Sequence, residues 1–177
     1  NLVSVPVQPF DPEARAVFGD LEALGNVIEG NLYLYDRDRG YELYPNLFQN
    51  IALGRGYWLY LDYADDVTAV GVQGALATED MTLPLPRGWN LIGYPFLTSQ
   101  PLANCRVSDG VNTKSLDDAV ASGWIGGALY YWEPDGGGYR ALSSAGYAHD
   151  DSLRPWYGYW TYAGHEDLSL IVPVPSP

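Results

Sequence analysis

The chain has 177 residues, of which 47% are hydrophobic and only 18% are charged, so it can bury a core and is neither disordered nor a coiled coil. Its 22 acidic and 9 basic residues give a formal net charge of −13. Nucleic-acid backbones and anionic membranes both attract clustered cations, so this charge argues against either as a partner.

Most of the chain is predicted to form short β-strands, because apolar and polar residues alternate between Gly, Pro and Asp. The predicted strands cover residues 2–6, 31–36, 41–44, 56–62, 67–73, 81–85, 89–94, 128–133, 138–142, 157–162 and 167–173. Glycine-containing turns join 31–36 to 41–44 and 128–133 to 138–142, which predicts two hairpins.

One short helix is expected in each half of the chain. Asp11 can cap the first helix and Pro12 suits its first turn. The apolar face of this helix is predicted to consist of Ala14, Val17, Phe18, Leu21 and Leu24. Ser115 can cap a second helix over residues 116–121, which Gly123 would end.

The two halves of the sequence match each other in five segments that occur in the same order. The matching segments are 1–6 with 90–95, 32–36 with 129–133, 40–41 with 138–139, 56–60 with 158–162, and 66–70 with 167–171. Five ordered matches indicate an internal duplication, although any one of them alone would be weak.

The fold class predicted from these patterns is mainly β, with two β repeats related by a pseudo-twofold axis. Each repeat contributes one short helix, and the repeats span about 1–86 and 87–174 of a single domain. Each repeat alone would leave sheet edges exposed, so we expect both to be fused into one sandwich or one barrel. In residues 173–177 every second residue is a proline, and this segment is predicted to begin a linker to a longer parent polypeptide.

Catalytic, cofactor and metal signatures are weak. His149 and His165 lie beside acidic residues in loops, and no Gly-x-Ser-x-Gly motif is present. The single cysteine, Cys105, is expected to be a small buried residue. The acidic turn after residue 35 lacks the spacing of an EF-hand. We therefore expect no enzyme, no cofactor and no metal, with a small hydrolase as the least favoured alternative.

The aromatic residues divide into those that recur in both halves and those that do not. The recurring pairs are Tyr33/Tyr130, Tyr35/Trp132, Tyr41/Tyr139, Tyr57/Tyr159, Trp58/Trp160 and Tyr60/Tyr162, and they are expected to pack the core or pair across strands.

Aromatic residues without a counterpart are candidates for stacking on sugar rings, with nearby polar side chains bonding the hydroxyls. The predicted ligand-binding residues are Trp124, Trp156, Tyr157, Tyr94, Tyr147, Asp135, Asp150, Asp151 and Arg154. The alternative is that these aromatic residues cover the ends of a barrel.

Two segments resemble parts of a known repeat module. They are Gly88-Trp89-Asn90-Leu91-Ile92-Gly93-Tyr94-Pro95 and Gly54-Arg55-Gly56-Tyr57-Trp58. They resemble a repeat module of secreted and surface bacterial proteins, with a Gly-Trp-Asn-Leu-Ile/Val-Ser-x-Pro opening and a later Gly-x-Gly-Tyr-Trp. Gly93 departs from the usual Ser, and Trp156 from the usual small residue.

The resemblance implies an extracellular or cell-surface accessory role. Together with the unmatched aromatics, it makes a non-catalytic carbohydrate-binding module the first hypothesis, with a polysaccharide or oligosaccharide as partner. A structural spacer or protein-adhesion domain is the alternative.

Overall fold

The structure is a computed structural model that describes residues 1–23, 28–61, 71–144 and 150–176. It is mainly β, with 44% strand and 11% helix, which confirms the predicted fold class. Its helices are α1 (Ala14–Ala23), α2 (Leu116–Ala121) and the 3-10 turn η1 (Leu102–Asn104). Within the described chain, no helix is long and apolar enough to cross a membrane.

Within the described residues, the strands are grouped into three four-stranded sheets and two short two-stranded ones. Those in the first part of the chain are β1 (Leu2–Ser4), β2 (Gln8–Pro9), β3 (Leu32–Asp36), β4 (Gly40–Leu43), β5 (Gly56–Leu59) and β6 (Gly74–Ala75). Those that follow are β7 (Met81–Leu85), β8 (Gly88–Gly93), β9 (Gln100–Pro101), β10 (Arg106–Ser108), β11 (Thr113–Ser115), β12 (Leu129–Glu133), β13 (Gly138–Leu142), β14 (Ser152–Leu153), β15 (Gly158–Ala163) and β16 (Leu168–Val172).

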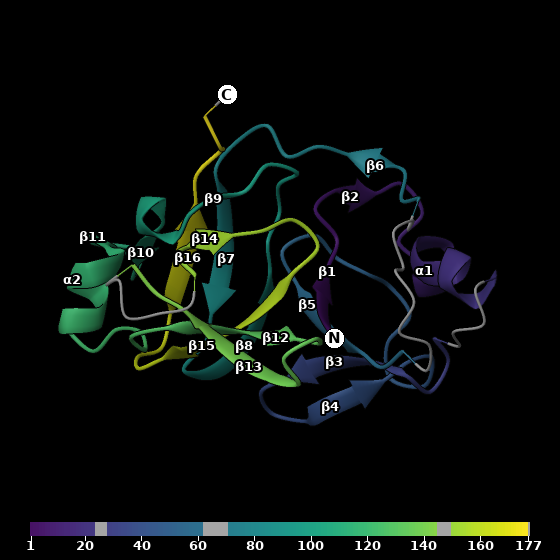
Figure 1. Cartoon of the computed structure of the whole chain (residues 1–177). Coiled ribbons are helices and arrows are strands. Elements are labelled where there is room, and N and C mark those ends of the chain that lie inside the picture. The colour runs from purple at the N-terminus through teal and green to yellow at the C-terminus, as the bar shows by residue number, and fades with distance from the viewer. Residues whose placement is uncertain (24–27, 62–70, 145–149, 177) are drawn as a thin grey trace.

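Two of the four-stranded sheets have the same strand order. The first-half sheet is ordered β1-β5-β3-β4, and the second-half sheet, read from β8, is ordered β8-β15-β12-β13. Each strand in one sheet is the sequence counterpart of the strand at the same place in the other. Figure 1 shows the two sheets beside each other along the lower side of the molecule, and bridges from Val3 to Tyr157 and from Arg55 to Ile92 join them.

The contacts across this junction are reciprocal, as a twofold axis requires. Ser4 donates its backbone N–H to the carbonyl of Trp156 at 2.8 Å, and Gly93 donates to the carbonyl of Gly54 at 2.9 Å. Ser4 matches Gly93 and Trp156 matches Gly54 in the duplication, so the two bonds are copies of each other. The junction is therefore an internal pseudo-dyad.

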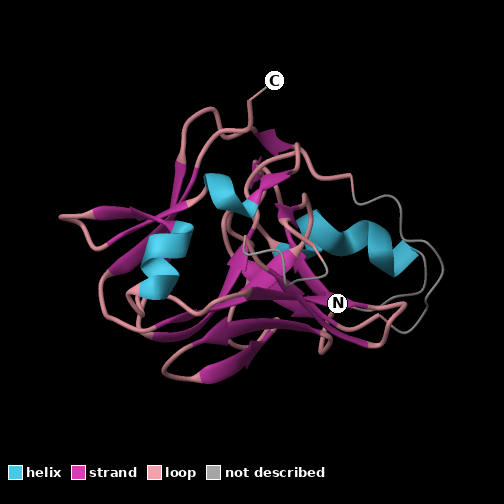
Figure 2. Cartoon of the chain, turned by 60° about the vertical axis from the view of Figure 1, so that its left-hand side comes forward, coloured by secondary structure: helices cyan, strands magenta, loops and turns pink. Residues whose placement is uncertain are grey.

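Different elements cover the inner faces of the two sheets. The second-half sheet packs against a third sheet, ordered β11-β10-β16-β7, and the core between them includes Leu129, Tyr159 and Leu170. In the first half, α1 packs its buried side chains, including Val17 and Phe18, against the sheet. Figure 2 shows both sheets in the lower layer, with the helices above them.

Both predicted helices form, but α1 begins at Ala14, and Glu13 rather than Asp11 accepts an N–H of its first turn, from Ala16 at 3.1 Å. The buried residues of α1 include Ala14, Val17, Phe18 and Leu21, as the helical spacing predicts, whereas Leu24 lies outside the described residues. Ser115 Oγ caps α2 by accepting the N–H of Asp118, and Gly123 follows with a φ of 72°.

Two segments differ from their predicted place. Strand β7 pairs with β16 and contributes Leu83 and Leu85 to the second-half core, although the predicted boundary places it in the first repeat. Pro173 and Val174, predicted to begin a linker, are bonded to the body of the domain. The Pro173 carbonyl accepts Gln100 Nε2–H at 2.9 Å, and the Val174 N–H donates to Asp80 Oδ1 at 3.0 Å.

Candidate functional site

The outer face of the second-half sheet is aromatic. Side chains alternate between the faces of a strand, so Tyr131 and Tyr159 enter the core while their neighbours Tyr130 and Trp160 point the other way. On β8, Trp89 shares the outer face with Leu91. The same alternation that builds the core therefore places a second set of rings on the opposite side of the sheet.

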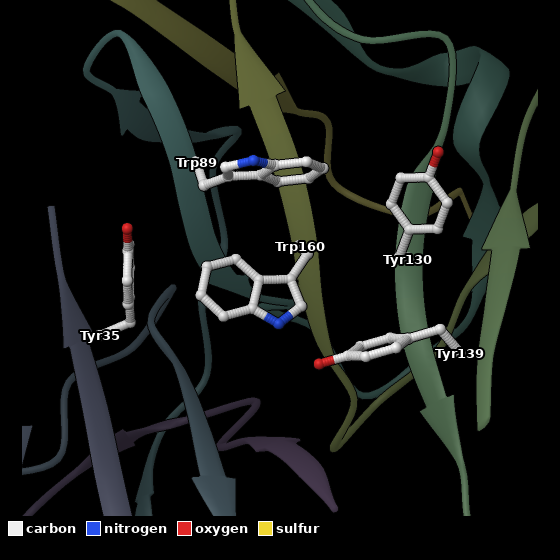
Figure 3. Close-up of a pocket in the computed structure, with 5 residues that line it drawn as sticks. All are labelled: Tyr35, Trp89, Tyr130, Tyr139 and Trp160. Carbon is white, nitrogen blue, oxygen red and sulfur yellow. The ribbon is translucent and has the colours of Figure 1, made fainter. Parts of the chain in front are cut away.

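Four of these rings and one from the first-half sheet line an open pocket, which we call the aromatic pocket. It has a volume of about 470 Å³ and is lined by Tyr35, Trp89, Tyr130, Tyr139 and Trp160 (Figure 3). Four of the rings come from the second-half sheet, and Tyr35 comes from β3 across the pseudo-dyad. The pocket thus depends on both halves of the chain.

Trp160 is the floor of the aromatic pocket. Its side chain packs on Leu2 and Leu91, one from each half, and it is only 9% exposed. Trp89 stands at 89° to it with ring centroids 6.3 Å apart, and Tyr35 at 76° with centroids 4.7 Å apart. Figure 3 shows Trp89 and Tyr139 on opposite sides of the Trp160 ring. The walls are therefore set by edge-to-face packing on a buried floor.

The walls of the aromatic pocket are open to solvent. Trp89 is 44% exposed, Tyr139 51% and Tyr130 36%. Tyr41 and Tyr162 extend the same exposed surface, since Tyr41 contacts the Trp160 ring and Tyr162 contacts the Trp89 ring. Large exposed rings around a fixed floor are typical of a binding surface rather than of a core.

A second groove, of about 400 Å³, adjoins the aromatic pocket and shares Tyr35 and Trp89 with it. We call it the polar groove, because its lining includes Asp36, Arg37, Asp38, Arg55 and Asn90. The two grooves therefore meet at Tyr35 and Trp89, so flat apolar rings lie next to hydrogen-bonding groups.

Hydrogen bonds fix the charged turn beside the polar groove. Asp36 Oδ1 accepts the backbone N–H of Asp38 at 2.9 Å and of Arg39 at 3.0 Å. Both bonds hold the pKa of Asp36 below its usual range, and the bond from Arg39 has the larger effect. The acidic turn is therefore organised as a hairpin turn.

An ion pair ties this turn to the second half. Arg37 donates to Glu166 at 3.2 Å and to the Arg87 carbonyl at 3.1 Å. The backbone N–H of Arg87, and then Arg37, lower the pKa of Glu166, while Glu166 and Asp38 raise that of Arg37. One wall of the polar groove is thereby linked to the end of the second repeat.

Tyr94, one of the predicted ligand-binding residues, is only 1% exposed, so the expectation that it presents a free ring is wrong. Its ring packs against Phe96 and its hydroxyl donates to the Thr98 carbonyl at 2.6 Å. Burial raises the pKa of this hydroxyl. Tyr94 follows the last residue of β8, where the chain turns into the core. Another predicted residue, Tyr147, lies outside the described part of the chain.

Tyr157, Arg154 and Asp150 form one cluster, but their contacts are structural. The Tyr157 ring packs against Tyr131 and is half-buried against the core. Arg154 forms an ion pair with Asp150, and its guanidinium lies 5.8 Å from the Tyr157 ring centroid. These side chains hold the loop that precedes β15 and do not line the aromatic pocket.

The remaining predicted residues are distributed among other features. Trp124 is half-buried under Lys114, whose Nζ lies 4.0 Å from the ring centroid. Trp156 is 37% exposed, and Asp135 and Asp151 are exposed loop residues. None of these four residues lines the aromatic pocket, so the structure does not gather the predicted set into that site.

The recurring aromatics supply four of the five rings of the pocket. Tyr130 and Trp160 pair across strands, as expected, but they do so on the outer face of the sheet. The exposed recurring aromatics are Tyr41, Tyr60, Tyr130, Tyr139 and Tyr162. Recurrence in both halves predicts burial or cross-strand pairing, but Tyr131 and Tyr159, which enter the core, are each adjacent in sequence to an aromatic residue that lies on the opposite face of the sheet. The period-2 alternation of strands 129–133 and 158–163 contained this signal.

No catalytic group stands out near these rings. Cys105 is fully buried, as expected, and burial raises the pKa of its thiol to about 12. His165 is exposed, and His149 lies outside the described residues. In the ranges that the structure describes, no three His, Cys, Asp or Glu side chains are grouped to hold a metal ion.

Comparison with known proteins adds no assignment to this geometry. The chain matches no protein-family model. Searches of curated proteins and of solved structures find no match either.

Proposed function

We propose that the chain is a non-catalytic carbohydrate-binding module of an extracellular protein and that the aromatic pocket is its binding site. The observation that carries this proposal is the pocket itself, in which exposed rings stand around the buried Trp160. Sugar rings present apolar C–H faces that stack on indole and phenol rings. A pocket of about 470 Å³ has room for more than one such ring.

The polar groove supports the same ligand class. Sugar hydroxyls require donors and acceptors beside the stacking surface, and the groove supplies the exposed residues Arg37, Asp38 and Arg55. Trp89 lines both the pocket and the groove, so a chain of sugars would cross it. The proposed site therefore runs from Tyr139, past Trp89, to Arg55.

The test is binding of a panel of soluble polysaccharides, measured by affinity electrophoresis and by titration calorimetry. Replacing Trp89 by Ala is expected to weaken binding about tenfold or more, because one stacking wall is lost. The matched control is Trp156→Ala, since Trp156 is similarly exposed but lies outside the pocket. Unchanged binding in the Trp89 variant, or no binding to any polysaccharide of the panel, would refute the proposal.

A protein-adhesion role is the second candidate, and the exposed face favours it. Tyr41, Tyr139, Trp89 and Tyr162 form a wider aromatic surface than one sugar needs. In that case the wild-type protein would self-associate or retain a protein partner through this face. Sedimentation of the wild type and of the Trp89→Ala variant, without polysaccharide, separates this role from the first.

A further inference from the structure

The rings of the aromatic pocket enclose a space from several directions. Trp89 and Tyr35 both stand nearly perpendicular to the floor ring Trp160, and Tyr139 lies on the side opposite Trp89 (Figure 3). The face of an aromatic ring carries partial negative charge, so rings that surround a point attract a cation placed there. Tryptophan, which supplies the floor and one wall, is the most effective ring for this interaction.

The charges around the aromatic pocket agree with a positive ligand. None of the five lining residues is charged, so no lysine or arginine of the lining competes for the rings. The whole chain carries a formal net charge of −13. In the adjoining polar groove, Arg37 is neutralised by Glu166 and Asp38.

We propose that the aromatic pocket selects carbohydrates that carry a protonated amine, such as β-1,4-linked glucosamine, over neutral sugars of the same shape. This inference rests on the proposed carbohydrate-binding function and names its ligand class. The pyranose faces stack on Trp89 and Trp160, and the ammonium group lies among the ring faces. A neutral hydroxyl or acetamide at the same carbon meets walls that are almost wholly apolar, and it gains no equivalent attraction.

The experiment compares three tetrasaccharides with the same β-1,4 backbone and different groups at carbon 2. These are the tetramers of glucose, N-acetylglucosamine and glucosamine, which carry a hydroxyl, an acetamide and an ammonium group. Titration calorimetry on the whole chain is expected to give about fivefold or tighter binding for the glucosamine tetramer, the size of one cation–π contribution. Raising the pH above the pKa of the ligand amines is expected to abolish this preference.

The protein itself is suited to this pH comparison. Tyr41 contacts both Tyr35 and the floor ring Trp160 at the pocket edge. Burial, and then the neighbouring hydroxyls of Tyr139 and Tyr35, raise the pKa of Tyr41. The charged residues that line the adjoining polar groove are Asp36, Arg37, Asp38 and Arg55, and Glu166 is paired with Arg37. Carboxylates and guanidinium groups keep their charge between weakly acidic and weakly basic pH. A change in selectivity within this pH range therefore reflects deprotonation of the ligand amine.

A variant separates the cation effect from simple packing. Trp89→Leu keeps an apolar side chain and removes the ring, so it is expected to reduce the preference for the glucosamine tetramer. Trp156→Leu is the matched control and is expected to keep that preference. Equal loss of all three tetramers in Trp89→Leu, with the ratio unchanged, would contradict the cation role of Trp89.

The outcomes distinguish this inference from the proposed function. If the glucose or N-acetylglucosamine tetramer binds as tightly as the glucosamine tetramer, the amine preference is wrong and the carbohydrate function stands. The inference also fails if no tetramer binds while a polysaccharide of the panel does. If neither the tetramers nor the panel bind, the proposed function itself is wrong.

Discussion

The two halves of the molecule share their strand order and their contacts at the pseudo-dyad, yet four of the five rings that line the aromatic pocket come from the second half. Tyr57 and Tyr159 each accept a backbone N–H, from Ala52 and Arg154, at 2.8 Å in both cases. By contrast, Trp160 lines the aromatic pocket, whereas its counterpart Trp58 does not. Reciprocal contacts thus build the scaffold, and the outer face of the second-half sheet builds most of the pocket.

The ring contacts across the dyad show the same division. Tyr35 packs edge-on against Trp160, and its counterpart Trp132 packs edge-on against Trp58. These equivalent pairs hold the halves together. Trp89 adds a wall on the Trp160 side of the dyad, where the aromatic pocket lies. The same recurring rings therefore hold the halves together and, on this side, also line the pocket.

The largest effect is expected at the dyad, where Ser4 meets its counterpart Gly93. A β-carbon at position 93 would lie 2.6 Å from Ser4 Cβ and still closer to the Arg55 carbonyl, so only one copy can carry a side chain there. Gly93→Ala is expected to lower the free energy of unfolding by about 3 kcal/mol, measured by urea denaturation.

Gly138→Ala is the control for this variant, since nothing lies within 4 Å of a β-carbon there. Gly138→Ala should therefore lower the free energy of unfolding only slightly. A Gly93→Ala protein as stable as the control would mean that the two halves do not approach at Ser4 as described.

The next effect compares the buried residue Tyr57 with its counterpart Tyr159. Tyr57→Phe and Tyr159→Phe each leave a backbone N–H without its acceptor, so each should lower the free energy of unfolding by about 1–3 kcal/mol. Tyr162→Phe, at an exposed tyrosine, serves as the reference and should cost almost nothing. Strongly unequal losses at the two buried sites would show that the halves are not energetically equivalent.

A smaller effect is expected at Trp156, which adopts a φ of 70° where its counterpart Gly54 has 80°. A bulky residue is strained in this region, whereas glycine is not. In Trp156→Gly the relief of strain offsets the lost packing of a 37% exposed ring. The free energy of unfolding should therefore change by less than about 1 kcal/mol.

Thermal unfolding by circular dichroism checks this value, and carbohydrate affinity should be unaffected. A loss of several kcal/mol would identify Trp156 as an essential packing residue. A loss of affinity would restore it as a ligand-binding candidate.

The smallest effect is the pH dependence of the link between the halves at Glu166. Its pKa is lowered in the folded chain, so its ionised form stabilises the fold at neutral pH. That contribution is present above the ordinary glutamate pKa of about 4.3 and is lost as the pH falls through the lower folded value. Glu166→Gln should therefore unfold at a lower temperature than the wild type at neutral pH, and the difference should narrow on acidification. A difference that stays constant with pH would contradict this role.

Much of the fold could be predicted from the sequence, because alternation, turn residues and the duplication agree. Most of the predicted strands, both helices and the Ser115 cap of α2 form where these signals place them. Of the predicted strand 67–73, residues 67–70 lie outside the described residues and 71–73 do not belong to a strand. The exceptions are short pairs such as β2 with β6 and β9 with β14, whose two-residue strands are too brief to show a period. The pairing of strand β7 with the second half could not be predicted, because its partner β16 is far away in sequence and no local pattern indicates the contact.

The candidate site was harder to predict, since exposure depends on which face of a sheet is covered. Tyr130 and Tyr131 are adjacent and chemically identical, yet only Tyr131 faces the third sheet. Tyr94 has no counterpart aromatic, but it lies where the chain enters the core. Tyr35 enters the pocket only through the pseudo-dyad, and no local pattern encodes that contact.

The most direct test of the aromatic pocket is fluorine NMR of protein labelled with fluorotryptophan. The chain has six tryptophans, and single Trp→Phe variants assign their signals. On titration with a polysaccharide that binds, the signals of Trp89 and Trp160 should shift, whereas those of Trp124 and Trp156 should stay in place. If only the signals of Trp124 and Trp156 shift, and those of Trp89 and Trp160 do not, the aromatic pocket is not the binding site.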